Sequence, residues 1–213
     1  MSFIKTPAFL ENAFTNGYSQ MDPDDDNLKF SAVEIGKLNI KEGKIFACDP
    51  ISLYMEEPFT AEFPKGQFPV EVAIATINDD DERIGFARIR FTDTKPVKWS
   101  YALTDGQDPA ELEKDEIFGY GVDSGTGSFM DASGYTEYDN LYKEDVDLST
   151  VSKEMEKAYK DTRTWLMWEG KTSNAALFTT GYGDGLYASY IGYDANGNIC
   201  RLVTDFGLLE WTV

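Results

Sequence analysis

The strongest candidates for a chemical role lie in the glycine-rich run Gly121-Val122-Asp123-Ser124-Gly125-Thr126-Gly127-Ser128. An aspartate in such a glycine-rich turn has three uses in proteins. It can act as an acid or base in hydrolysis, it can belong to a loop that binds phosphate, or it can shape a turn between strands. Each enzymatic interpretation requires a second motif, so the rest of the chain decides between them.

The hydrolytic interpretation rests on Asp123-Ser124-Gly125-Thr126, which is similar to the active-site turn of pepsin-like aspartic proteases. That chemistry needs two carboxylates that share one proton, and no second Asp-Thr/Ser-Gly occurs in the chain. The phosphate interpretation rests on Asp-x-Gly-Thr-Gly, which is similar to a loop of actin-like ATPases. That fold alternates strands and helices, whereas only one strong helix is predicted here. A structural turn is therefore favoured, in which the glycines at 119, 121, 125 and 127 adopt positive φ and Asp123 caps backbone amides.

A divalent-metal site is the more specific hypothesis. Asp123, Asp131 and Asp184 all fall in predicted turns at strand ends, and Asp49 and Asp205 could complete the set. Such turns commonly present oxygen ligands to Ca²⁺ or Mg²⁺, and hard cations need no histidine. The first three aspartates are therefore the candidate catalytic and metal-binding residues of a carboxylate- or metal-dependent hydrolase. The alternative is that they belong to a solvated acidic face.

The composition excludes several classes of function. The chain contains no histidine, which removes Ser-His-Asp and Cys-His catalysis and the commonest zinc ligand. It has 38 acidic and 19 basic residues, a net charge of −19, which argues against binding to nucleic acid or to anionic membranes. Such a charge steers a protein toward basic partners. No cofactor is expected, with Ca²⁺ or Mg²⁺ as the candidate exceptions.

The length of 213 residues fits a single domain. Residues 1–27 are predicted to form a helical and acidic extension, with Thr6 capping a short helix, and residues 28–213 a β-rich core. The first residues lack the apolar core of a signal peptide and no segment approaches a membrane span, so a cytoplasmic location is expected. Cys48 and Cys200 lie in apolar runs without metal spacing, which predicts buried free thiols.

Alternating apolar and polar residues predict a mostly β fold of antiparallel, sandwich-like strands. Hairpins are expected over 36–48, over 68–91 and over 186–206, and in the last of these Asn196-Gly197 supplies the reversal. One longer helix is expected near 148–163, with short helical turns elsewhere. An α+β fold is the alternative.

The helix near 148–163 is predicted from apolar residues at three-and-four spacing. Its buried face is expected to contain Leu148, Val151, Met155 and either Ala158 or Tyr159. Its exposed face is expected to contain Lys153, Glu156 and Lys160.

The C-terminal third is rich in aromatic side chains, which include Phe178, Tyr182, Tyr187, Tyr190, Tyr193 and Trp211. The common use of such residues is the core of a sandwich. The functional alternative is an aromatic-lined groove that binds a sugar or a peptide.

Several glycine and aspartate motifs occur together and in order. They are Gly36-Lys37-Leu38, Gly43-Lys44-Ile45, Asp49-Pro50, Gly66-Gln67-Phe68-Pro69-Val70, Gly121-Val122-Asp123 with Gly125-Thr126-Gly127, Asp131, and Gly181-Tyr182-Gly183-Asp184-Gly185-Leu186-Tyr187. Over roughly residues 30–207 the chain resembles the bacterial family known as domain of unknown function 4241. The family more usually has tryptophan at the position of Tyr182. The resemblance implies an arrangement of motifs and no activity.

Two functions follow from these observations. The first is a binding or interaction module, for example an acidic inhibitor or immunity-type protein that neutralises a basic protein partner. The net charge and the lack of a complete catalytic set favour it. The second is the hydrolase that would use Asp123, Asp131 and Asp184.

Overall fold

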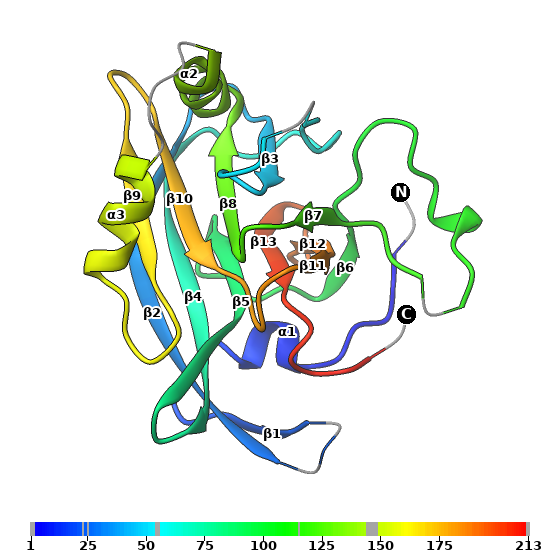
Figure 1. Ribbon diagram of the computed structural model, residues 1–213. Helices are drawn as coiled ribbons and strands as arrows, with labels where there is room; N and C mark the ends of the chain where they lie inside the picture. Colours follow the sequence, from blue (N-terminus) through cyan, green and yellow to red (C-terminus); the bar gives the residue numbers. More distant parts are fainter. Residues whose placement is uncertain are drawn as a thin grey trace.

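The computed structural model describes residues 3–22, 24, 26–53, 56–114, 116–143 and 149–211. It is mostly antiparallel β, with 44% of residues in strands and 13% in helices, as the alternating sequence pattern predicts. Two sheets pack face to face, and helices cover their outer faces (Figure 1). No helix within these residues is long and apolar enough to cross a membrane.

The larger sheet has seven strands and curls around the smaller one. Its strands, in spatial order, are β1 (Ser19–Met21), β2 (Asn27–Ile40), β4 (Gly66–Asn78), β5 (Asp81–Arg90), β13 (Ile199–Asp205), β12 (Ser189–Tyr193) and β6 (Lys98–Tyr101). The four-stranded sheet has the order β3 (Ile45–Cys48), β8 (Thr126–Asp131), β10 (Asn174–Thr179) and β9 (Trp165–Glu169). A two-stranded sheet pairs β7 (Tyr120–Val122) with β11 (Gly185–Tyr187). The helical segments are α1 (Phe9–Asn12), the 3₁₀ turn η1 (Pro109–Glu111), α2 (Ala132–Lys143) and α3 (Ser149–Lys157).

The layers follow from the alternation of side chains along each strand. In β10, Ala176 and Phe178 face the central core between the two sheets. Ala175 and Leu177 face outward and pack with α2 and α3. The other face of the larger sheet is covered by α1 and by the residues that follow β13.

Two of the three predicted hairpins are confirmed. β4 and β5 pair across the acidic turn that follows Asn78. β12 and β13 pair across a turn in which Gly197 has a φ of 83°. Asp194 stabilises this turn, because its Oδ1 accepts the backbone N–H groups of Asn196 and Asn198.

The hairpin predicted over 36–48 is wrong. β2 pairs with β1 and β4, whereas β3 pairs with β8, so the chain crosses from one sheet to the other at residues 41–44. All four residues of β3 are buried, and a strand buried on both faces carries no alternation that would specify its partner. The crossing is stabilised by Asp131, which accepts the N–H groups of Glu42 and Gly43.

The helix predicted near 148–163 is confirmed as α3, which buries Val151 and Met155. The side chains of Lys153, Glu156 and Lys160 are exposed, as expected. The helix ends at Lys157, six residues early, so Ala158 and Tyr159 both lie outside it and are exposed. Leu148 lies outside the described residues.

The helix α2 was not anticipated from the sequence. Its first turns contain Ser133, Gly134 and Thr136, which are poor helix formers. Gly134 is needed there, because a Cβ atom at this position would lie 2.7 Å from the carbonyl oxygen of Asn174 in β10. Close packing against the sheet therefore selects a residue that disfavours the helix in isolation.

The N-terminal segment packs against the larger sheet. Phe9 and Leu10 of α1 are buried there. Thr6 does not cap the helix as predicted, since Ala8 occupies the N-cap position and no side chain caps it. The two cysteines are free and buried, as predicted, and burial raises the pKa of Cys48 to about 12.

Candidate binding site

The three aspartates predicted as catalytic or metal-binding residues do not share one site. Asp123 and Asp184 are exposed and adjoin the paired residues Val122 and Gly185 at one end of the β7–β11 sheet. Asp131 is fully buried at the far end of β8. That six-residue strand spans about 17 Å at its usual rise per residue.

The carboxylate of Asp131 is occupied by structural hydrogen bonds. Its Oδ1 accepts from Gly43 N at 3.0 Å, and its Oδ2 accepts from Ser133 Oγ at 2.6 Å and Ser133 N at 3.2 Å. Ser133 lies in the first turn of α2, so Asp131 caps this helix as well as the crossing between the sheets. These protein hydrogen bonds satisfy the buried carboxylate of Asp131, so its burial requires no bound ligand.

The glycine-rich turn is stabilised by Asp49 and not by Asp123, contrary to the sequence interpretation. Asp49 Oδ2 accepts the backbone N–H groups of Asp123 and Ser124 at 2.9 and 2.8 Å, and its Oδ1 accepts from Ser124 Oγ. Of the four glycines expected to have positive φ, at 119, 121, 125 and 127, only Gly125 does. Within the described residues, no group of three or more acidic, cysteine or histidine side chains could hold a metal ion.

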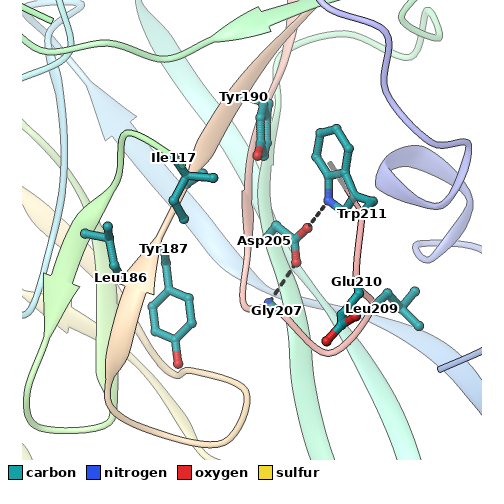
Figure 2. A pocket seen from close by; sticks show the side chains of 10 residues that line it. Ile117, Leu186, Tyr187, Tyr190, Asp205, Gly207, Leu209, Glu210 and Trp211 are labelled. Atoms are coloured by element: carbon teal, nitrogen blue, oxygen red, sulfur yellow. Dashed lines mark hydrogen bonds between the residues drawn. The ribbon is translucent and has the colours of Figure 1, made fainter. Parts of the chain in front are cut away.

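A cavity of about 530 Å³ lies on the outer face of the larger sheet, where the chain returns over it after β13. Its lining residues are Ile117, Leu186, Tyr187, Ala188, Tyr190, Asp205, Gly207, Leu209, Glu210 and Trp211, and we call it the Asp205 cavity. Figure 2 shows Ile117, Leu186 and Tyr187 on one wall and Trp211, Leu209 and Glu210 on the other, with Asp205 between them.

Asp205 is positioned by the end of β13 and by the turn that follows. Its Oδ1 accepts from Gly207 N at 2.9 Å, in a turn that Gly207 permits with a φ of 69°. Its Oδ2 accepts from Trp211 Nε1 at 2.8 Å. The two bonds hold the carboxylate in one orientation and fix the indole ring as a wall of the cavity (Figure 2).

The electrostatic environment of Asp205 is unusual for a carboxylate. The residue is only 7% exposed, and burial raises its pKa to about 6, against the smaller lowering effect of the Trp211 and Gly207 hydrogen bonds. Among the described residues, no lysine or arginine forms an ion pair with it. A buried negative charge without a cationic partner is costly and marks functional sites.

Tyr190 contributes a second polar group. The residue is 2% exposed, and its ring centre lies 5.2 Å from that of Trp211. Figure 2 shows its hydroxyl directed into the cavity on the side of Asp205. Burial, together with the nearby Asp205 carboxylate, raises the pKa of Tyr190, so the phenol remains neutral.

These groups define what the cavity can bind. Each oxygen of Asp205 accepts one hydrogen bond and retains acceptor capacity. The Tyr190 hydroxyl can donate or accept, and the rings of Tyr190 and Trp211 offer faces that attract cations. The combination suits a positively charged group that carries N–H donors.

Part of this site is predictable from the sequence. Asp205 is one of the additional ligand candidates, and Tyr187, Tyr190 and Trp211 are among the candidates for an aromatic groove. Phe178 and Tyr193 belong instead to the central core. Tyr182 is exposed and lies 5.4 Å from the guanidinium of Arg83, outside the cavity.

Ile117, Leu186 and Glu210 were missed as cavity residues. The available signal was Asp205-Phe206-Gly207, an acidic residue and a glycine placed directly after a run of apolar strand residues. That pattern indicates a buried carboxylate at a turn, but it does not reveal which segments face it.

The fold and the cavity define a mostly antiparallel β protein with an acidic, aromatic-lined cavity outside its sheets. The model of the family described as "Protein of unknown function (DUF4241)" matches residues 38–204, and the chain belongs to that family. The resemblance inferred from the glycine and aspartate motifs is thus confirmed. No curated protein and no solved structure matches the chain. The match covers Tyr190 and ends one residue before Asp205.

Proposed function

We propose that this chain is a binding module whose Asp205 cavity takes a positively charged group of its ligand. The observation that supports the proposal is the buried Asp205 carboxylate, which has no ion-pair partner among the described residues and shares its cavity with the side chain of Tyr190. A bound cation would compensate the desolvation of this charge. It would also contact the aromatic faces of Tyr190 and Trp211.

The charge of the whole chain favours the same class of ligand. A net charge of −19 attracts cations and basic proteins over distances longer than a contact. An acidic inhibitor or immunity-type protein that neutralises a basic partner is the form of this function that the charge favours. The three originally predicted aspartates lend less support to a hydrolase, since Asp131 is occupied by backbone donors and lies apart from Asp123 and Asp184.

A small-molecule titration tests this proposal. Ethylguanidinium is added to the ¹⁵N-labelled full chain, and the indole N–H signal of Trp211, identified with Trp211→Phe, is followed by NMR. Because this N–H donates to Asp205, we expect a saturable shift. The uncharged analogue ethylurea is expected to cause none.

Variants localise the effect. Asp205→Asn is expected to weaken ethylguanidinium binding at least tenfold, and Tyr190→Phe to weaken it less. Glu111→Gln removes an exposed carboxylate outside the cavity and serves as the matched control. An unshifted Trp211 signal in the parent protein, or unchanged affinity in a folded Asp205→Asn variant, would contradict the proposal.

A further inference from the structure

The mouth of the Asp205 cavity exposes two large apolar side chains. Leu186 is 52% exposed and Ile117 is 37% exposed. Both line the wall opposite Trp211 (Figure 2). An exposed leucine is ordinary by itself, but here two apolar side chains flank a buried carboxylate. A small cation would leave both uncovered, so they indicate a larger ligand that carries apolar surface beside its charge.

The acceptor geometry of Asp205 distinguishes between cations. Trp211 Nε1 occupies one position on Oδ2, and Gly207 N occupies one position on Oδ1. One acceptor position therefore remains on each of the two oxygens. A guanidinium presents paired N–H groups that match two carboxylate oxygens, and its plane stacks on aromatic rings, whereas an ammonium is a point charge.

We propose that the ligand is a polypeptide that inserts one arginine side chain into the Asp205 cavity and places a neighbouring apolar side chain on Leu186 and Ile117. This inference rests on the proposed function, because it names the source of the cation. Charge complementarity supports it: Asp205 is the floor of the cavity, Glu210 lies in its wall, and the net charge of −19 favours a basic partner. Arginine anchors in such pockets, surrounded by apolar contacts that exclude water, commonly dominate protein interfaces.

Short peptides test the source of the cation. The affinities of the full chain for acetyl-Leu-Arg-Leu-amide and acetyl-Gly-Arg-Gly-amide are measured by NMR titration. We expect the leucine-flanked peptide to bind about tenfold more tightly. Citrulline in place of arginine should abolish binding, and lysine should weaken it several-fold. Equal affinities for the two arginine peptides would contradict the proposed contact with Leu186 and Ile117. Equal affinities for the arginine peptide and its lysine analogue would contradict the assignment of the cation to arginine.

A variant of Leu186, at the mouth of the cavity, tests this inference separately from the proposed function. Leu186→Ser should remove the tenfold advantage of the leucine-flanked peptide, measured as the ratio of the affinities of the two arginine peptides for the same variant, so that an effect of the cavity wall on the shared arginine cancels. Val97→Ser is the control, since Val97 is 61% exposed and lies outside the cavity. Retention of the advantage in Leu186→Ser would overturn the inference while the cation site stands. Failure of ethylguanidinium itself to bind would overturn the proposed function.

Discussion

At the scale of single residues, burial of the Asp205 carboxylate reduces the stability of the fold but provides a hydrogen-bond acceptor for a ligand. Its carboxylate is removed from water and accepts two neutral hydrogen bonds, which compensate only part of the lost hydration. The raised pKa expresses this cost. Residues arranged for binding commonly reduce the stability of the unliganded protein.

This cost predicts a pH dependence. The pKa of Asp205 is about 6 in the folded protein and 3.8 as its ordinary value, so between these pH values the folded chain holds a proton that the unfolded chain has lost. The free energy of unfolding should therefore rise, relative to Asp205→Asn, as pH falls from 8 to 5, by about 1 kcal/mol.

Thermal melts of both proteins at several pH values between 5 and 8 measure this difference. Tyr190 stays neutral throughout, because burial raises its pKa. Cation binding should weaken over the same interval as Asp205 takes up its proton. A difference between the two proteins that is constant with pH would show that Asp205 is not the titrating group.

Asp49 and Asp123 contact the same turn, but we expect their substitution to affect the free energy of unfolding very differently. Asp49 is 2% exposed and accepts from both backbone and side-chain donors. Asp49→Ala should lower the free energy of unfolding by about 3 kcal/mol, because buried donors lose a charged acceptor. Asp123 is exposed, and Asp123→Asn should change it by less than about 0.5 kcal/mol. Urea denaturation measures the free energy of unfolding of both variants. A larger loss in Asp123→Asn than in Asp49→Ala would contradict this prediction.

At the scale of elements, the contact between β7 and β8 depends on a missing side chain. A Cβ atom at Gly127 would lie 2.8 Å from the hydroxyl of Tyr120 and 3.0 Å from Cγ2 of Thr180. The Tyr120 hydroxyl is buried and forms no hydrogen bond of normal geometry among the described residues, although the side chain of Thr204 lies close enough to oppose the rise of its pKa by burial. Gly127 is therefore required for close approach rather than for positive φ.

A double-mutant cycle tests this contact. Gly127→Ala should destabilise the protein by about 2 kcal/mol through overpacking. Tyr120→Phe should cost little, since it removes a hydroxyl that forms no hydrogen bond of normal geometry. In the double variant, the added methyl group can occupy the space of that hydroxyl. We therefore expect about 1 kcal/mol of the unfolding free energy lost in Gly127→Ala to be recovered. Strictly additive effects in chemical denaturation would argue against the contact.

At the scale of the whole molecule, a buried ionic network joins the N-terminal segment to the larger sheet. Glu11 accepts from Arg88 Nη1 at 3.1 Å and from Arg201 Nη2 at 3.0 Å. The side chain of Arg201 is only 3% exposed. The guanidinium of Arg88 also lies over the ring of Phe14, at 4.0 Å from its centre. Residues that precede the family match thus complete the fold.

Removing the charge of Glu11 should therefore destabilise the entire domain. Glu11→Gln leaves two buried guanidinium groups undercompensated, and we expect a loss of about 3 kcal/mol in the free energy of unfolding. Glu34→Gln is the control, because Glu34 is 45% exposed and lies 3.8 Å from Arg90. Its loss should be below about 0.5 kcal/mol. Equal losses in calorimetry would mean that the network does not bind the segment to the sheet.

Features that depend on neighbouring residues can be predicted from the sequence of this protein. The β-rich class follows from alternation, the β12–β13 hairpin from Asn196-Gly197, and the buried face of α3 from the spacing of Val151 and Met155. In each case the physical cause acts within a few residues, through backbone dihedral preferences or through one apolar face. The missing histidine likewise excluded whole classes of catalysis without reference to any fold.

Which distant segments contact one another is visible only in the folded protein. The buried strand β3 pairs with β8, about 80 residues away, and not with its neighbour β2. The Asp205 cavity combines β11, β12, the end of β13, the following turn and Ile117. Asp131 and Asp205 both lie at strand ends. The carboxylate of Asp131 accepts hydrogen bonds from the backbone across the sheet crossing, whereas that of Asp205 lines a cavity. The difference arises from long-range packing, because the donors and walls around each carboxylate come from distant parts of the chain.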